Sequence, residues 1–134
     1  SLSVFSPEDA ALTLQKIRTA LKPGGRLFLD VDNKPFYTRY GSSYRNWYTT
    51  PNGLTLTDVY FHHDTSVEVI RDILINDEDG SIGQFICFKR IYDESDIRYL
   101  LEQNGFAIQQ IYGNWDLMAL SDISPKIILT ATVA

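Results

Sequence analysis

Apolar residues recur along the chain with two different periods, which predict helices at some positions and strands at others. In the first segment, Ala10, Leu14, Ile17 and Leu21 share helical spacing. Ser6 precedes this stripe as a suitable N-cap, and a proline follows it at the first helical position. The stripe stops at a Lys-Pro-Gly-Gly sequence, because proline cannot continue a helix and glycine tolerates the turn. The pattern therefore predicts a helix over 7–21.

The segment 26–31 that follows is a nearly continuous apolar run. Such a run is typical of a strand buried on both faces, as in a parallel sheet under helices. Residues 32–53 then change character, with prolines, glycines and many aromatic side chains. This composition predicts a long irregular loop, and loops of this length inside a domain are usually functional or mobile.

Three segments with strict alternation come next, at 54–63, 67–75 and 85–91. Each places apolar side chains at every second position, which is the period of a strand. Short polar turns at 63–66 and 76–80 separate the three segments. The pattern predicts a three-stranded antiparallel insert over 54–91.

The remaining segments predict a second helix and two more strands. Asp93 and Asp96 have the spacing of a capping box, and Gly105 suits a left-handed C-cap. Residues 106–112 and 126–133 read as strands, with a loop between them. The order of elements predicts an α/β fold with an antiparallel addition.

Composition narrows the class of partner. The 134 residues fit one domain, and a net charge of −5 with a pI near 4.8 argues against binding to nucleic acid or to an anionic membrane. Cys87 is the only cysteine, so neither an intrachain disulfide nor a thiolate zinc cluster is expected. No metal site is predicted, and no run of residues has the length of an apolar membrane span. A cytoplasmic location is expected.

Two groups of polar and aromatic residues are candidates for binding a substrate. Asp32 and Asn33 end the predicted buried strand, where they could orient or deprotonate an acceptor or could instead form an Asx turn. Tyr37, Tyr40 and Trp47 in the predicted loop could form the wall of a small-molecule pocket. Packing of this loop onto the insert is the alternative for these aromatic side chains.

Two further candidates, Tyr60 and His62, share one face of the first insert strand. His62 and His63 are neighbours on a strand and so point to opposite faces, which prevents them from binding one metal ion together. A general-base role for His62 is one reading, and a surface histidine at the end of a hairpin is the other.

Several segments resemble class I S-adenosylmethionine-dependent methyltransferases. The sequence LKPGGRLFLD, from Leu21 to Asp30, is similar to the turn and fifth strand of that family. The sequence LLEQNGF, from Leu100 to Phe106, resembles the end of the helix before the sixth strand. The closing segment from Ser124 to Ala134 looks like the seventh strand, which in the family lies antiparallel beside the fifth. The resemblance implies a partial Rossmann-like sheet of strands five to seven, carrying the three-stranded insert.

The resemblance also implies a substrate side for the regions around Arg90 and Trp115, which complete the set of candidate residues. Structural packing is the alternative for both. The implied reaction is transfer of a methyl group from S-adenosylmethionine to a small-molecule acceptor. Because such transfer depends mainly on proximity and orientation, no fixed catalytic motif is expected.

The glycine-rich cofactor motif of the family is missing from this sequence. Gly24 and Gly25 precede a strand and cannot act as the cradle that normally follows the first one. We therefore expect residues 1–134 to be the C-terminal part of a methyltransferase domain, unable to bind S-adenosylmethionine and inactive alone. An unpaired strand edge would then favour self-association, for example as a dimer. A non-catalytic binding or dimerisation module, or a lipid- or metabolite-carrying domain, is the alternative.

Overall fold

The computed structural model of the protein describes residues 2–41 and 43–134. In chain order its elements are the 3-10 helix η1 (Leu2–Val4), α1 (Pro7–Ala20), β1 (Arg26–Asp32), α2 (Lys34–Tyr40), β2 (Tyr44–Thr50), β3 (Gly53–His62), β4 (Val67–Asn76), β5 (Ile82–Arg90), α3 (Glu94–Gln103), β6 (Phe106–Tyr112) and β7 (Lys126–Val133). The class is α/β, as the order of sequence patterns predicted.

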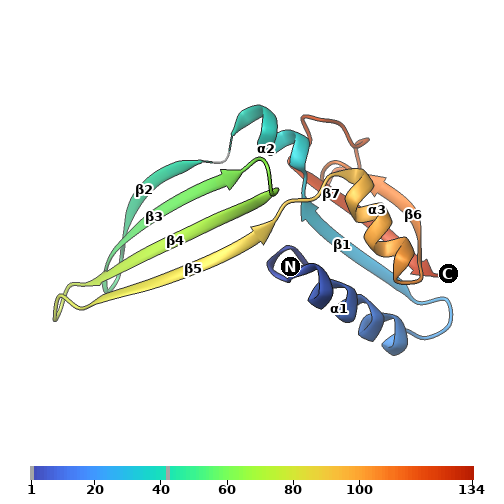
Figure 1. The fold of residues 1–134 in the computed structure, drawn as a ribbon, viewed down its shortest axis with the longest axis horizontal. Coiled ribbons are helices and arrows are strands. Elements are labelled where there is room, and N and C mark those ends of the chain that lie inside the picture. The colour runs from blue at the N-terminus through green and yellow to red at the C-terminus, as the bar shows by residue number, and fades with distance from the viewer. Residues whose placement is uncertain (1, 42) are drawn as a thin grey trace.

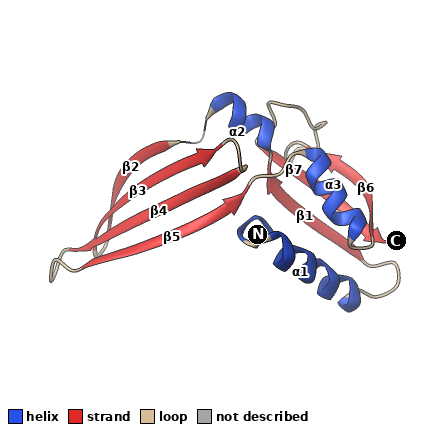
Figure 2. Ribbon diagram, in the orientation of Figure 1, coloured by secondary structure: helices blue, strands red, loops and turns tan. Residues whose placement is uncertain are grey.

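The strands of the described residues form two separate sheets that lie side by side (Figure 1). One has the order β1-β7-β6, and the other has the order β2-β3-β4-β5. Strand β7 runs antiparallel to β1, as the resemblance implied. Helix α2 lies where the chain passes from the first sheet to the second (Figure 2).

Local capping signals define the two longer helices. The Ser6 hydroxyl accepts a hydrogen bond from the backbone N–H of Asp9 at 3.1 Å, and Pro7 begins α1 as predicted. Helix α3 has a complete capping box, in which Asp93 and Asp96 satisfy each other's backbone N–H groups. Gly105 follows α3 with φ of 80°, the left-handed geometry predicted for it.

The main core lies between these two helices and one face of the β1-β7-β6 sheet (Figure 1). Leu14 of α1 and Ile97 of α3 meet Leu129 of β7 there, and all three side chains are at most 1% exposed. The opposite face of the sheet is more open, because Phe28 of β1 remains 54% exposed. The expectation that β1 is buried on both faces was therefore wrong. Among the described residues, β1 forms a ladder with β7 only, and this ladder is antiparallel. The apolar run had suggested a parallel pairing.

The predicted irregular loop over 32–53 is also wrong, because it contains α2 and β2. Strand β2 pairs with β3 along its whole length, so the insert has four strands rather than three and begins at Tyr44. All residues of β2 are exposed, which explains why its sequence lacks the apolar alternation of a half-buried strand. Pairing with β3 therefore stabilises β2, since its own side chains bury little surface.

Candidate functional site

A group of charged side chains lies at the end of β1, where the two sheets meet. The carboxylate of Asp32 is 2.5 Å from Nζ of Lys89 and 2.8 Å from Nζ of Lys126. The Asp32 side chain is only 7% exposed, so these ion pairs are largely shielded from water. Glu68, with a side chain 6% exposed, lies 3.6 Å from the same Lys89 ammonium. We call Asp32, Tyr37, Glu68, Lys89 and Lys126 the charge cluster.

Strand register brings these residues together. Asp32 and Lys126 are directly opposite each other on β1 and β7, and Glu68 and Lys89 are opposite each other on β4 and β5. Side chains of directly opposed residues project from the same face of a sheet, so each of these carboxylates lies beside the lysine opposite it. The Lys89 ammonium then connects the two pairs by contacting both Asp32 and Glu68.

Tyr37 of α2 adds a hydroxyl to the charge cluster. Burial, together with the charge of Asp32, raises the pKa of this phenol to about 12, and the opposing effect of Lys89 is smaller. A hydrogen bond to the Asp32 carboxylate acts in the same direction. The Tyr37 ring is held in place from the other sheet by Phe61 of β3, with ring centroids 6.1 Å apart. Tyr37 therefore stays protonated at neutral pH and acts as a donor.

The pKa values of the charged groups favour the ionised forms. Burial alone would raise the pKa of Asp32, but hydrogen bonds and charge from Lys126 and Lys89 outweigh it and hold the pKa below its usual value. Burial alone would lower the pKa of Lys89, but the hydrogen bond and charge of Asp32 outweigh it and raise the pKa. A carboxylate with a lowered pKa is a weak base at neutral pH. The charge cluster is therefore suited to orient a polar group rather than to remove its proton.

Asn33, the residue next to Asp32, has a clear structural role. Its side-chain amide donates to the backbone carbonyls of Ser121 at 3.1 Å and Ser124 at 2.8 Å. The residue is 2% exposed, so the amide is fully occupied in holding the loop between β6 and β7 against the end of β1. The predicted Asx turn is not seen as a cap, because the Asn33 side chain makes no capping hydrogen bond to α2.

The remaining candidate residues are spread over several surfaces. Tyr40 lies on α2, is 58% exposed and packs against Phe36 at 4.8 Å between ring centroids. Trp47 of β2, 64% exposed, and Tyr60 of β3, 56% exposed, project from the outer face of the four-stranded sheet. Tyr60 contacts the ring of His62, whereas Phe61 contacts His63, so the two histidines do point to opposite faces.

Arg90 and Trp115 lie apart from the charge cluster as well. Trp115 packs beside Phe28 on the open face of β1, with ring centroids 5.7 Å apart. Arg90 lines a cavity of about 700 Å³ beside α3, together with Tyr92 and Lys34. Of the sequence candidates, Asp32 and Tyr37 therefore meet in the charge cluster, and Tyr60 and His62 contact each other on the outer face of the four-stranded sheet.

Glu68, Lys89 and Lys126 were missed as site residues by the sequence reasoning. The sequence could have indicated Glu68 and Lys89 only through strand register, since these two residues are paired across the β4–β5 hairpin. Hairpin register places opposite charges face to face when the turn length is known. Lys126, at the start of β7, could not have been placed beside Asp32 without the sheet order.

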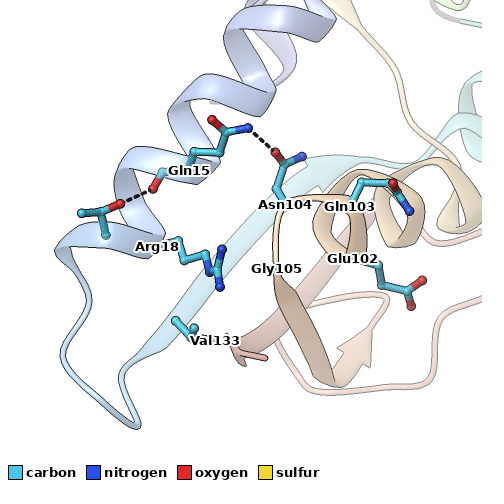
Figure 3. A pocket seen from close by; sticks show the side chains of 8 residues that line it. Gln15, Arg18, Glu102, Gln103, Asn104, Gly105 and Val133 are labelled. Carbon is cyan, nitrogen blue, oxygen red and sulfur yellow. Dashed lines mark hydrogen bonds between the residues drawn. The ribbon is translucent and has the colours of Figure 1, made fainter.

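A second cavity of about 690 Å³ lies between the C-terminal ends of α1 and α3 (Figure 3). Gln15 donates to the side-chain oxygen of Asn104 at 3.2 Å across it. The Arg18 guanidinium lies over Gly105, where a Cβ would come within 2.7 Å of it. These polar groups connect the two helices, and none of them belongs to the charge cluster.

The described parts of the chain contain neither a metal-binding cluster nor a membrane-spanning helix. Over residues 2–41 and 43–134, no three His, Cys, Asp or Glu side chains converge in a way that could hold a metal ion. Within the same ranges, no helix has the length and apolar character needed to cross a membrane.

Solved structures of methyltransferases resemble this chain over nearly its whole length. An S-adenosylmethionine-dependent methyltransferase from Clostridium acetobutylicum aligns over 100% of the chain, with a TM-score of 0.78 at 15% identity, and 55% of its own length is covered. The CcbJ methyltransferase from Streptomyces caelestis aligns over 99% of the chain, with a TM-score of 0.75 at 12% identity and 57% of its length covered. The chain therefore has the fold of the corresponding part of these methyltransferases.

The sugar N-methyltransferase KedS8 from a Streptoalloteichus species aligns more loosely. Its TM-score is 0.60 at 12% identity, over 94% of this chain and 50% of its own. The chain thus spans between half and three fifths of the length of these structures. No protein-family model matches the sequence, and no curated protein matches it.

The paired glycines of this chain have a local structural role. Its paired glycines, Gly24 and Gly25, form the tight turn before β1, with φ of 75° at Gly24. A Cβ on Gly25 would come within 2.8 Å of the Lys22 carbonyl oxygen, so the glycine is required by the turn itself. The two glycines therefore serve the turn that connects α1 to β1.

Proposed function

We propose that this chain forms the acceptor-binding side of an S-adenosylmethionine-dependent methyltransferase that acts on small molecules. The observation that carries the proposal is the methyltransferase fold over 99–100% of the chain in two of the compared structures. Residues outside these 134 would bind the donor, because the glycine-rich motif is missing from the sequence. The donor would supply an electrophilic methyl group to a lone pair of the acceptor, and S-adenosylhomocysteine would be the leaving group.

The position of the charge cluster supports a role in binding the acceptor. It follows the C-terminal end of β1, and in open α/β sheets ligands bind beyond the C-terminal ends of strands. Its side chains come from α2, β1, β4, β5 and β7, so the insert and the main sheet both contribute. Tyr37 as a fixed donor and Asp32 as a fixed anion give the region a defined polarity.

A small acceptor fits this chemistry better than a nucleic acid. The net charge is −5, and the two lysines of the charge cluster are already paired with carboxylates. No excess positive charge therefore remains there for a phosphate backbone. KedS8 is by its name a sugar N-methyltransferase, which makes amino sugars the first acceptors to test.

A non-catalytic methyltransferase-like module is the second candidate. The absence of the glycine-rich segment favours it, and so does the mutual pairing of charges within the charge cluster. Under this reading the cluster has a structural role only and joins the two sheets. The two candidates differ in whether conservative changes in the cluster affect turnover of a protein that keeps its fold.

The test uses the protein encoded by the whole reading frame, with release of S-adenosylhomocysteine measured against a panel of amino sugars. We expect Tyr37→Phe to raise KM for the acceptor about tenfold, because it removes the donor that orients Asp32. Tyr40→Phe is the matched control, since it removes the same hydroxyl from an exposed position on the same helix. Its KM should stay within about twofold of the parent value.

Equal KM values for the two tyrosine variants would show that the charge cluster is not part of the acceptor site. No turnover with any amino sugar, together with no donor binding, would favour the non-catalytic module. Thermal unfolding of each variant separates a binding defect from a folding defect.

A further inference from the structure

A cavity of about 320 Å³ lies on the outer face of the four-stranded sheet. Strand register arranges its side chains in two rows across β2, β3 and β4, one apolar and one charged. The apolar row is Trp47, Leu56 and Ile73, and the charged row is Arg45, Asp58 and Arg71. The rows are two positions apart on each strand, so they lie side by side on the same face at a distance of about 7 Å.

This cavity is separate from the charge cluster. Arg71 and Glu68 are three positions apart on β4, so their side chains leave opposite faces of the sheet. Glu68 belongs to the charge cluster, whereas Arg71 lines the cavity. An inference about the cavity therefore does not rest on the proposed methyl transfer.

The charged row carries two cations and one anion. Nε of Arg45 donates to one carboxylate oxygen of Asp58 at 3.2 Å, and Nη2 of Arg71 donates to the other at 3.0 Å. Both oxygens of Asp58 are engaged, while each guanidinium donates to the described residues from a single nitrogen and has further N–H groups to offer. The Arg45 side chain is 85% exposed, so its pairing with Asp58 is weak and can rearrange. The row therefore has positive charge and donors for a second carboxylate.

The apolar row presents an indole ring that lacks a stacking partner. The Trp47 residue is 64% exposed, and among the described residues no other aromatic ring and no cation lies against it. Its neighbour in the row, Leu56, is also exposed. An aromatic face beside aliphatic side chains is a surface on which a planar apolar group stacks favourably. The cavity thus combines a stacking surface with an excess of guanidinium charge.

We propose that this cavity binds an arylalkyl carboxylate, which is an aromatic ring joined to a carboxylate by a short aliphatic arm. The ring stacks on Trp47 beside Leu56, and the carboxylate accepts hydrogen bonds from Arg45 and Arg71. Guanidinium groups suit this contact because they present parallel N–H groups to the two carboxylate oxygens. The separation of about 7 Å between the two rows calls for an arm of roughly two carbon atoms. A volume of about 320 Å³ is at the lower end of the range for small-molecule sites, so one such ligand fills it.

The test is calorimetric titration of hydrocinnamate, a phenyl ring with a two-carbon arm and a carboxylate, into the protein. Hydrocinnamide keeps the ring and the arm without the charge, and propionate keeps the charge without the ring. We expect saturable binding of hydrocinnamate and at least about tenfold weaker binding of both comparison compounds. Equal affinity for the amide would contradict the role of the carboxylate. Absence of saturable hydrocinnamate binding would overturn the proposal, and so would an affinity that falls as protein concentration rises, because a second copy would then cover this face.

Two aspartate variants separate a built site from general charge attraction. Asp58→Asn removes the carboxylate that competes for both guanidinium groups, and should strengthen hydrocinnamate binding about threefold or more. Asp72→Asn removes the same charge from the same sheet, but Asp72 is opposite Thr57 on the other face. Its affinity should stay within about 1.5-fold of the parent value. Equal strengthening in the two variants would show charge attraction only and would contradict the proposal.

Two tryptophan variants test the stacking surface. Trp47→Ala should weaken hydrocinnamate binding about tenfold, because it removes the aromatic face. Trp115→Ala is the matched control, since Trp115 is also 64% exposed but lies beside Phe28 on the other sheet. The control should change affinity by less than about twofold. Thermal unfolding verifies that both variants are folded, and equal weakening in two folded variants would contradict the assigned position of the ring.

Discussion

The ammonium of Lys89 lies 2.5 Å from the carboxylate of Asp32, and this ion pair joins the two sheets of the molecule. Lys89 belongs to β5 of the four-stranded sheet, and Asp32 ends β1 of the other sheet. Both side chains are largely buried, with 23% and 7% of their surface exposed. The contact therefore combines a structural role with the polarity of the proposed acceptor site.

Replacing Lys89 with methionine should destabilise the protein by about 3 kcal/mol, because Asp32 loses one cation and Glu68 loses its ion pair while both remain buried. Urea unfolding monitored by circular dichroism measures the change. Arg98→Met is the control, since it breaks an exposed pair with Glu94 on α3. That change should cost less than about 1 kcal/mol. A similar loss of unfolding free energy in the two variants would show that the buried ion pair stabilises the protein no more than the exposed one.

Asp32 should make stability depend on pH on the acid side. Its folded pKa is below its unfolded value, so the native state binds fewer protons. The stability from this group is complete above the unfolded pKa of about 3.9 and is lost as pH falls through the lower folded pKa. Urea midpoints measured from neutral to acid pH should fall less steeply in Asp32→Asn. Asp30→Asn, at a half-exposed neighbour of Lys126, is the comparison. An unchanged acid slope in Asp32→Asn would contradict the assigned pairing.

Local sequence signals predicted the two longer helices, α1 and α3, and every strand except β2. Ser6 and the Asp93–Asp96 capping box marked helix starts correctly, because a cap depends only on residues within one turn. Strand β2 and helix α2 were missed, since the side chains of Tyr44–Thr50 are all exposed and those of Lys34–Tyr40 include none that is buried. Their sequences therefore lack the apolar period on which prediction depends.

The candidate site was harder to predict than the fold. Asp32 and Tyr37 were found because they follow a strand that the apolar run defined. Glu68 and Lys89 belong to a hairpin whose register became clear only with the structure. Trp47 and Tyr60 lie on the outer face of the four-stranded sheet, away from the charge cluster, and Trp47 lines a cavity of about 320 Å³ there. Composition thus identified residue types, whereas tertiary pairing decided which of them meet.

Replacing Gly53 should destabilise the protein more than replacing a glycine in the interior of a strand of the same sheet. It has φ of 154°, and a Cβ there would collide with the carbonyl oxygen of Ile75 on β4. Gly53→Ala should therefore destabilise the protein by more than about 2 kcal/mol. Gly83→Ala in β5 is the matched control, because a Cβ at that position meets no atom within 4 Å. Thermal unfolding should show a change of less than about 0.5 kcal/mol for the control.

The free edge of β1 leads us to expect self-association of this chain. Within the described residues β1 pairs with β7 alone, and Phe28 on its open face is 54% exposed. Unpaired strand edges beside apolar surface favour pairing with another chain. Sedimentation should show a dimer or larger species that Phe28→Lys dissociates. Phe88→Lys, at an exposed position on β5, tests an edge strand of the four-stranded sheet. A monomeric parent chain, or dissociation by Phe88→Lys alone, would contradict the expectation.

The measurement that tests the central claim most directly is calorimetric titration of S-adenosylhomocysteine into this chain and into the protein encoded by the whole reading frame. We predict binding to the longer protein only, because we propose that this chain forms the acceptor side and that residues outside it bind the donor. Tight binding to the 134-residue chain would show that the assignment of its glycines and of its role is wrong. Binding to neither protein would contradict the methyltransferase function itself.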